Sequence, residues 1–121
     1  MKSILVIAHG SRRAAANEEV IEWVERLRER LTDWPVALGF LELAEPTMQA
    51  GLDQLLSGTC EEVLIMPYFL ASGRHVTEDI PEFVAAQLVR YPDLTITVLP
   101  HIGTHDGVLE TAKTLLMNAP T

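Results

Sequence analysis

Apolar positions fall into two alternating patterns along the chain. Continuous apolar runs rich in β-branched residues occupy positions 3–8 and 63–67, and positions 36–41 and 94–100 have a similar pattern. Short, largely apolar runs of this kind are typical of strands that are buried on both faces of a parallel sheet. We therefore predict one strand in each of these segments.

An apolar spacing of three to four residues follows each predicted strand and indicates amphipathic helices. Pro46 and Gly58 are placed to begin and end the second helix. Thr77 or Asp79 is expected to cap the third helix, and the fourth starts near Asp106. The apolar stripes are Val20, Val24, Leu27 and Leu31; Met48, Leu52, Leu55 and Leu56; Ile80, Phe83, Val84 and Leu88; and Leu109, Ala112, Leu115 and Leu116.

The alternation of strand and helix predicts an α/β fold. Parallel strands joined by right-handed helical crossovers form a sheet that is covered on both faces, so we expect a three-layer sandwich with a four-stranded parallel sheet. The commonest small open arrangement gives the strand order 2-1-3-4. No linker or low-complexity segment divides the chain, which predicts a single domain over residues 1–121.

Composition and charge narrow the class of protein. With 121 residues, 48% of them hydrophobic, the chain can bury a core without a disulfide or a structural metal. Cys60 is the only cysteine, which excludes an intramolecular disulfide and a four-cysteine metal site and favours the cytoplasm. The N-terminal apolar run is too short for a signal peptide or a membrane span. The net charge of −8 argues against nucleic acid as a partner.

Ionisable side chains follow the first three predicted strands. His9 comes directly after the first strand, Glu42 after the second, and His75 after the third. Ligands of open parallel sheets bind beyond the carboxyl ends of the strands, and neighbouring strands lie about 4.8 Å apart. Two imidazoles and a carboxylate at adjacent strand ends can therefore converge on one ion, and cobalt, nickel, ferrous iron or zinc would accept these ligands.

Each of these residues also has a structural interpretation. A histidine after a strand is often a hydrogen-bonded loop residue, and a glutamate there is often solvated or caps a helix. His101 and His105 follow the fourth strand, one place further out, and are expected to be loop residues or secondary partners of the site. No glycine-rich phosphate loop and no Ser-His-Asp order is present, and Cys60 lies at the opposite end of its strand, where a structural role is expected.

Three segments resemble one known family. "ILVIAHGSR" at the first strand, "FLELAEPTM" at the second and "MPYFLASGRHVTEDIP" at the third are similar, in order and spacing, to the class II tetrapyrrole chelatases, in particular the short form of sirohydrochlorin cobaltochelatase. The resemblance covers essentially the whole chain. It implies a flavodoxin-like, chelatase-like fold and the insertion of a divalent metal into sirohydrochlorin, on a route to cobalamin, sirohaem or a nickel tetrapyrrole.

The resemblance also implies roles for individual residues. His9 and His75 would handle the metal, and His9, Glu42 and His75 together would be the catalytic residues. The predicted substrate-binding residues surround the histidines in the sequence, and the arginines among them would meet the carboxylates of the tetrapyrrole. They are Arg12, Arg13, Ser72, Gly73 and Arg74.

The resemblance leaves several alternatives open. No permanently bound cofactor is expected, because cobalt, nickel or iron would be a substrate. The chain has one unit where longer relatives have two, which predicts a homodimer with the tetrapyrrole near the cleft between subunits. A non-enzymatic protein that binds or delivers a metal or a tetrapyrrole would need the same histidines, and the sequence does not separate these functions.

Overall fold

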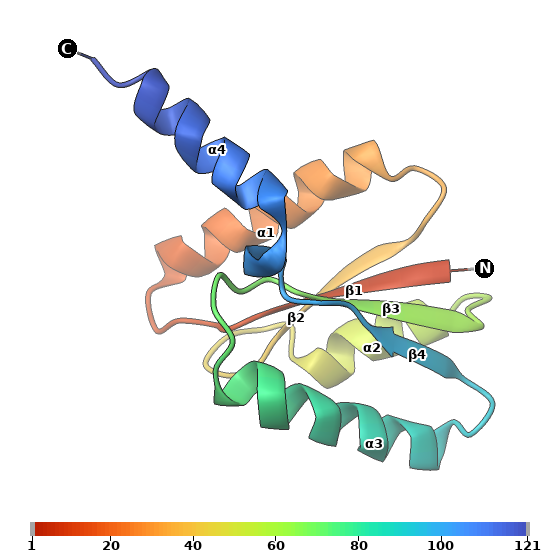
Figure 1. The fold of residues 1–121 in the computed structure, drawn as a ribbon. Helices are drawn as coiled ribbons and strands as arrows, with labels where there is room; N and C mark the ends of the chain where they lie inside the picture. The colour runs from red at the N-terminus through yellow and green to blue at the C-terminus, as the bar shows by residue number, and fades with distance from the viewer. Residues whose placement is uncertain (1, 121) are drawn as a thin grey trace.

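The computed structural model describes residues 2–120 as an α/β fold (Figure 1). Four strands alternate with four α-helices, and two short helical turns precede the last two helices. In chain order the elements are β1 (Lys2–Ala8), α1 (Ala14–Arg30), β2 (Val36–Phe40), α2 (Met48–Leu56), β3 (Glu62–Pro67), the π-helical turn η1 (His75–Asp79), α3 (Ile80–Arg90), β4 (Thr95–Val98), the 3-10 turn η2 (Ile102–Thr104) and α4 (Asp106–Met117).

The sheet has the predicted topology. All strand pairs are parallel and the order is β2-β1-β3-β4, so the winding reverses beside β1. The registers pair Ala8 with Phe40 and Ile7 with Pro67, which brings the carboxyl ends of the first three strands to one edge. The predicted fold class and strand order are therefore confirmed.

Two apolar cores lie on opposite faces of the sheet. On one face, α2 and α3 cover a core that includes Leu5, Ile65 and Ile80. On the other face, α1 covers a core that includes Val6, Val24 and Phe40. Figure 1 shows α2 and α3 on one side of the strands and α1 on the other. Each of these buried side chains contributes about 1.5–3 kcal/mol to folding, and together they hold the strand ends in place.

The third helix begins differently from the prediction. Neither Thr77 nor Asp79 caps it, because a π-helical turn from His75 to Asp79 leads directly into α3. The Thr77 hydroxyl donates to the carbonyl of Gly73 instead, and the Asp79 carboxylate accepts from the His75 ring. The second helix starts at Met48, and Thr47, the residue after Pro46, caps it. The helix ends at Leu56, before Gly58.

The fourth helix has the predicted bounds but an unexpected position. It packs mainly on η2 and projects away from the sheet, with the C-terminal end of the chain at its tip (Figure 1). The helices α1, α2 and α3 thus cover the two faces of the sheet, while α4 extends beyond it. Within residues 2–120 no helix is both long and apolar enough to cross a lipid bilayer.

Candidate metal centre

His9 and Glu42 are held together by the backbone at the ends of β1 and β2. The amide of Leu41 donates to the carbonyl of Ala8 at 2.9 Å, and the amide of Glu42 donates to the carbonyl of His9 at 3.2 Å. Gly10 has a φ of 93°, and a Cβ atom there would lie 1.8 Å from the carbonyl oxygen of Glu42. Only glycine allows this close approach, so Gly10 fixes the spacing of the two exit segments.

His75 reaches the same place from the other side of β1. The chain leaves β3 at Pro67, crosses an exposed segment and turns into η1, whose first residue is His75. A π-helical turn is rare and is frequently found at functional sites. Here the turn places His75 and Asp79 on one face, with His75 Nδ1 2.6 Å from Asp79 Oδ2.

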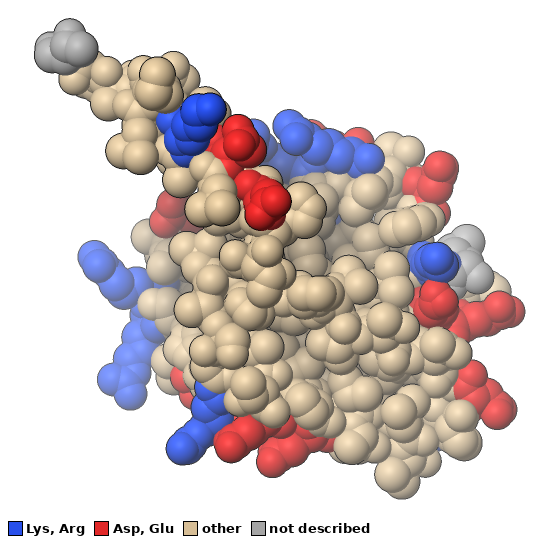
Figure 2. Space-filling model, in the orientation of Figure 1, with Lys and Arg blue, Asp and Glu red and all other residues tan. Residues whose placement is uncertain are grey.

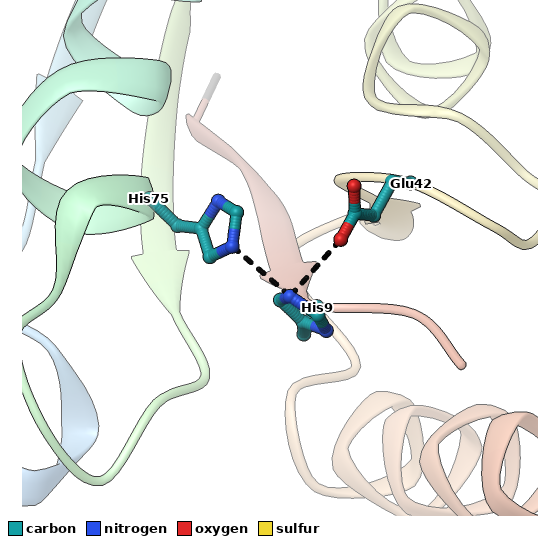
Figure 3. Close-up of side chains that lie close together, drawn as sticks. All are labelled: His9, Glu42 and His75. Atoms are coloured by element: carbon teal, nitrogen blue, oxygen red, sulfur yellow. Dashed lines mark hydrogen bonds and ion pairs between the residues drawn. The ribbon is translucent and has the colours of Figure 1, made fainter.

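The three predicted ligands converge (Figure 3). His9 Nε2 lies 3.0 Å from His75 Nε2 and 3.2 Å from Glu42 Oε1. One ligand atom from each residue lies within 4.8 Å of the other two, and among residues 2–120 this is the group of three that could hold a metal ion. About half of the His9 and Glu42 side-chain surface is exposed, so a ligand can reach the group from solvent.

The hydrogen bonds of the two Nδ1 atoms leave both Nε2 atoms facing the centre. His9 Nδ1 lies 2.9 Å from the carbonyl oxygen of Gly10, and His75 Nδ1 contacts the Asp79 carboxylate. Because these oxygens accept, both Nδ1 atoms donate, and the two Nε2 atoms remain as the nitrogens that can bind an ion.

The geometry is close to that of a metal site. Two imidazole nitrogens at about 2.1 Å from an ion in tetrahedral geometry lie about 3.4 Å apart. The Nε2 atoms are 3.0 Å apart, so an ion needs them to separate by about 0.4 Å. Two imidazoles and one carboxylate leave at least one coordination position open, which suits an ion that must be passed on.

The other residues predicted to bind substrate are exposed and lie close to His9 and His75 along the chain. Arg12 and Arg13 are exposed just before α1, and Ser72 and Gly73 lie on the exposed segment before η1. Arg74 is exposed and its Nε lies 3.4 Å from Glu78 Oε2. Their roles in binding a substrate stay predictions.

Two further histidines and the cysteine lie outside the centre. His105 caps α4, because its Nδ1 accepts from the amide of Gly107 at 2.9 Å. His101 immediately precedes η2 and is half-buried. Cys60 is half-buried ahead of β3, at the opposite end of the strand from His75, and its Sγ contacts the carbonyl of Glu62. A loop role for the histidines is consistent with these positions.

The sequence reasoning missed one residue of the centre. The sequence predicts Asp79 only near the start of a helix, as a possible cap, whereas in the structure its carboxylate accepts from the His75 ring. The signal was present, because a histidine and an aspartate four residues apart lie on the same face of a helix. A carboxylate that accepts from one nitrogen of a histidine directs the lone pair of the other nitrogen toward a metal.

Comparison with known proteins places the chain in a family. The family model described as CbiX matches residues 3–119. The chain belongs to the CbiX family. This confirms the resemblance that the three sequence segments indicated.

The curated relatives within this family carry two metal names. The sirohydrochlorin ferrochelatase of Bacillus subtilis is 28% identical over 109 residues, which are 90% of this chain and 42% of the relative. The sirohydrochlorin cobaltochelatase of Methanothermobacter thermautotrophicus is 33% identical over 81 residues, 67% of this chain and 56% of the relative. The chain thus spans about half the length of the curated relatives it matches.

Solved CbiX-like structures include one chain of similar size and one of about twice the size. A putative cobalamin biosynthesis CbiX protein from Marinobacter aquaeolei has a TM-score of 0.80 at 25% identity, over 98% of this chain and 100% of that one. The sirohydrochlorin chelatase SirB from Bacillus subtilis subspecies spizizenii, solved in complex with cobalt, has a TM-score of 0.88 at 27% identity, over 97% of this chain and 50% of that one.

Proposed function

We propose that this chain catalyses the insertion of a divalent metal into sirohydrochlorin. The observation that carries the proposal is the convergence of His9, Glu42 and His75 at the ends of three adjacent strands. Membership of the CbiX family supports the same activity, since relatives in it are named as sirohydrochlorin chelatases.

Cobalt is the ion that we favour, on a route to cobalamin. A relative that is 33% identical is named a cobaltochelatase, and a structural relative was solved with cobalt. Ferrous iron, which would lead to sirohaem, and nickel are the alternatives, because the same imidazole and carboxylate ligands accept all three ions. The choice among them in the cell depends on metal supply as well as on affinity.

Metal insertion exchanges two protons for one divalent ion. The macrocycle loses two pyrrole N–H protons, while the ion exchanges its protein and water ligands for four macrocycle nitrogens. In our mechanism His9 Nε2 and His75 Nε2 hold the ion, and Glu42, 3.2 Å from His9 Nε2, accepts a proton. Once the ion has left, the pair of Nε2 atoms, 3.0 Å apart, can take up the other proton.

Asp79 would act through His75. Its carboxylate accepts from His75 Nδ1 and thereby turns the Nε2 lone pair toward His9. Because that hydrogen bond fixes both the tautomer and the orientation of the ring, we assign Asp79 as a positioning residue.

The remaining assignments concern the substrate and the assembly. We propose that Arg12, Arg13 and Arg74, with Ser72 and Gly73 beside them, bind the carboxylates at the rim of sirohydrochlorin. We also propose that the protein acts as a homodimer, since the exposed centre offers too little concave surface to cover a flat macrocycle. A cytoplasmic location stays a prediction from the cysteine content.

A steady-state absorbance assay tests the activity. Purified chain is mixed with an excess of sirohydrochlorin and cobalt, ferrous or nickel ions, and the spectrum of the metallated product is followed. Many turnovers per chain are expected with at least one ion. If the chain binds one equivalent of metal or tetrapyrrole but does not accelerate insertion, it is a binding or delivery protein and the proposal is wrong.

The variant Glu42→Gln tests the proton role in the same assay. The amide keeps the size of the side chain but cannot take up a proton at neutral pH. We expect insertion to slow by about 100-fold, as for loss of a general base, while sirohydrochlorin still binds. Glu45→Gln, three residues further along the same segment, is the matched control and should keep the full rate. An unchanged rate for Glu42→Gln would assign proton removal to another group.

A further inference from the structure

The loop between β1 and α1 is held by a side chain that has no role in the proposed mechanism. Asn17 lies in the first turn of α1 and is half-buried. Its Oδ1 accepts from the amide N–H of Ser11 at 2.9 Å, and its Nδ2 donates to the carbonyl oxygen of Ser11 at 2.8 Å. One side-chain amide thus pairs with both backbone groups of a single loop residue.

Only one orientation of the Asn17 amide makes both bonds, because a backbone N–H can only donate and a carbonyl oxygen can only accept. Asparagine has a low helix propensity, since its side chain competes for backbone hydrogen bonds. In α1 this side chain bonds to the backbone of the preceding loop. Its position in the helix is therefore explained by the loop that it holds.

The bond to the Ser11 amide also bears on the metal centre. The N–H of Ser11 and the carbonyl of Gly10 belong to the same peptide group, and a trans peptide group is planar and points its N–H and C=O in opposite directions. The carbonyl oxygen of Gly10 accepts from His9 Nδ1 at 2.9 Å. Asn17 and the His9 ring therefore hold opposite sides of one peptide group.

This peptide group needs such support, because glycine restricts backbone rotation less than any other residue, and Gly10 has a φ of 93°. Rotation of the group would turn the Gly10 carbonyl away from His9 Nδ1. The bond from the Ser11 N–H to Asn17 opposes this rotation. It also polarises the peptide group, which makes the Gly10 carbonyl a better acceptor.

The rest of the loop is open to solvent. Arg12 and Arg13 are exposed, and basic side chains project from the side of the molecule where Figure 1 shows the start of α1 (Figure 2). The amide of Arg13 donates to Ser11 Oγ at 3.0 Å, which closes the loop on itself. The two bonds of Asn17 attach the loop to the body of α1.

We propose that Asn17 is a positioning residue for His9. It acts through the peptide group between them, which keeps His9 Nδ1 as a donor and leaves Nε2 for the ion. Asp79 holds the other imidazole by its Nδ1, so both rings of the centre are fixed from the side opposite the ion. The inference rests on the proposed metal centre but not on the insertion reaction.

Titration with cobalt ions alone tests the effect of Asn17 on metal binding. Asn17→Ala removes both hydrogen bonds, and cobalt affinity should fall by about 10-fold, the lower end of the effect of losing a group that orients a ligand. Asn17→Asp still accepts from the Ser11 N–H but turns a second oxygen toward the Ser11 carbonyl. It should lose stability in urea and yet keep most of its cobalt affinity. Glu18→Ala, an exposed neighbour on the same turn, is the matched control.

Proton NMR of the cobalt complex separates positioning from a purely structural role. A histidine that binds cobalt through Nε2 keeps its Nδ1 proton, which gives a paramagnetically shifted signal that exchanges with water. Asn17→Ala should speed the exchange of the His9 proton several-fold and leave the His75 proton unchanged. Asp79→Asn should do the reverse. Asn17→Asp should keep the slow exchange of the His9 proton, and His75→Ala in excess cobalt assigns the two signals.

Circular dichroism should show that each variant is folded. Unchanged cobalt affinity and unchanged exchange of the His9 proton in Asn17→Ala would overturn the inference. Equal losses of affinity in Asn17→Ala and Asn17→Asp, in proportion to their stability, would mean a structural role only and would overturn it as well. A protein that gives the expected results with cobalt but does not metallate sirohydrochlorin supports the inference and contradicts the proposed function. A protein that does not bind cobalt overturns both.

Discussion

The two halves of the metal centre are held in different ways. His9 and Glu42 leave the ends of two adjacent buried strands, and two backbone hydrogen bonds and Gly10 hold their exit segments together. His75 follows a longer exposed segment, and the π-helical turn and Asp79 hold its ring. The half with His9 and Glu42 is therefore fixed by backbone packing, whereas the half with His75 is fixed by a side-chain contact.

This difference suggests which half adjusts when an ion binds. The two Nε2 atoms are 3.0 Å apart and must separate by about 0.4 Å to share an ion. The backbone of His9 is bonded to Glu42 at the end of a buried strand, whereas His75 follows an exposed segment and its ring is held by the hydrogen bond to Asp79. We therefore expect the His75 half to provide the movement.

The largest effect is expected from removal of the adjustable ligand. His75→Ala leaves one imidazole in the centre. Loss of a residue that hydrogen-bonds to a ligand can lower metal affinity by about 100-fold, so loss of the ligand itself should lower cobalt affinity by more than this. Insertion should fall below detection, while circular dichroism is unchanged because no core contact is lost. Isothermal titration with cobalt measures the affinity. His101→Ala, outside the centre, is the control, and full turnover by His75→Ala would remove this residue from the mechanism.

Gly10→Ala should disrupt the packing of the exit segments that carry His9 and Glu42. The new Cβ atom would lie 1.8 Å from the Glu42 carbonyl oxygen, at a φ of 93° that disfavours alanine. The exit segments must then move apart, and we expect the free energy of unfolding to fall by about 2 kcal/mol or more. Urea denaturation measures the loss. Gly73→Ala is the control, because nothing lies within 4 Å of a Cβ atom there. Equal stability of the two variants would contradict the claim that the close approach at Gly10 fixes the spacing of the His9 and Glu42 segments.

Asp79→Asn should weaken the adjustable half without destroying it. The amide oxygen can still accept from His75 Nδ1, but the charge is lost, so cobalt affinity should fall by about 10-fold. Asp79→Ala removes the contact and should lower the affinity by up to about 100-fold. The d–d absorption of bound cobalt should change with ligand orientation in both. Glu78→Gln removes a charge from the same turn without changing His75 or Asp79, and it should bind cobalt with the affinity of the unchanged protein. Equal cobalt affinities of all three variants would mean that Asp79 does not position His75.

The smallest effect concerns the arginines around the centre. Raising the ionic strength from about 0.05 M to about 0.5 M should weaken sirohydrochlorin binding several-fold, because exposed charges are screened. Arg74→Ala should reduce this salt dependence, whereas Arg30→Ala, at the far end of α1, should not. Fluorescence quenching of the tetrapyrrole measures both. Salt-independent binding would mean that the arginines do not contact the substrate carboxylates.

The sequence was informative about the fold because the buried strands carry an unambiguous pattern. The apolar run at residues 3–8 reads as a strand buried on both faces, and β1 is paired on both sides in the centre of the sheet. The positions of His9, Glu42 and His75 next to such runs were enough to predict that their side chains approach one another. Helix starts were less predictable. Thr77 and Asp79 are residue types that often cap helices, but their side chains bond to Gly73 and His75 instead.

By itself the sequence determined which residues are strands, the order of the elements and the chemical types at the strand ends, because these follow from local periodicity and from the burial that a parallel sheet requires. Only the tertiary structure decided the close approach at Gly10 and the projection of α4. The physical reason is that each of these depends on where the chain returns in space, and residues far apart in the sequence set that position.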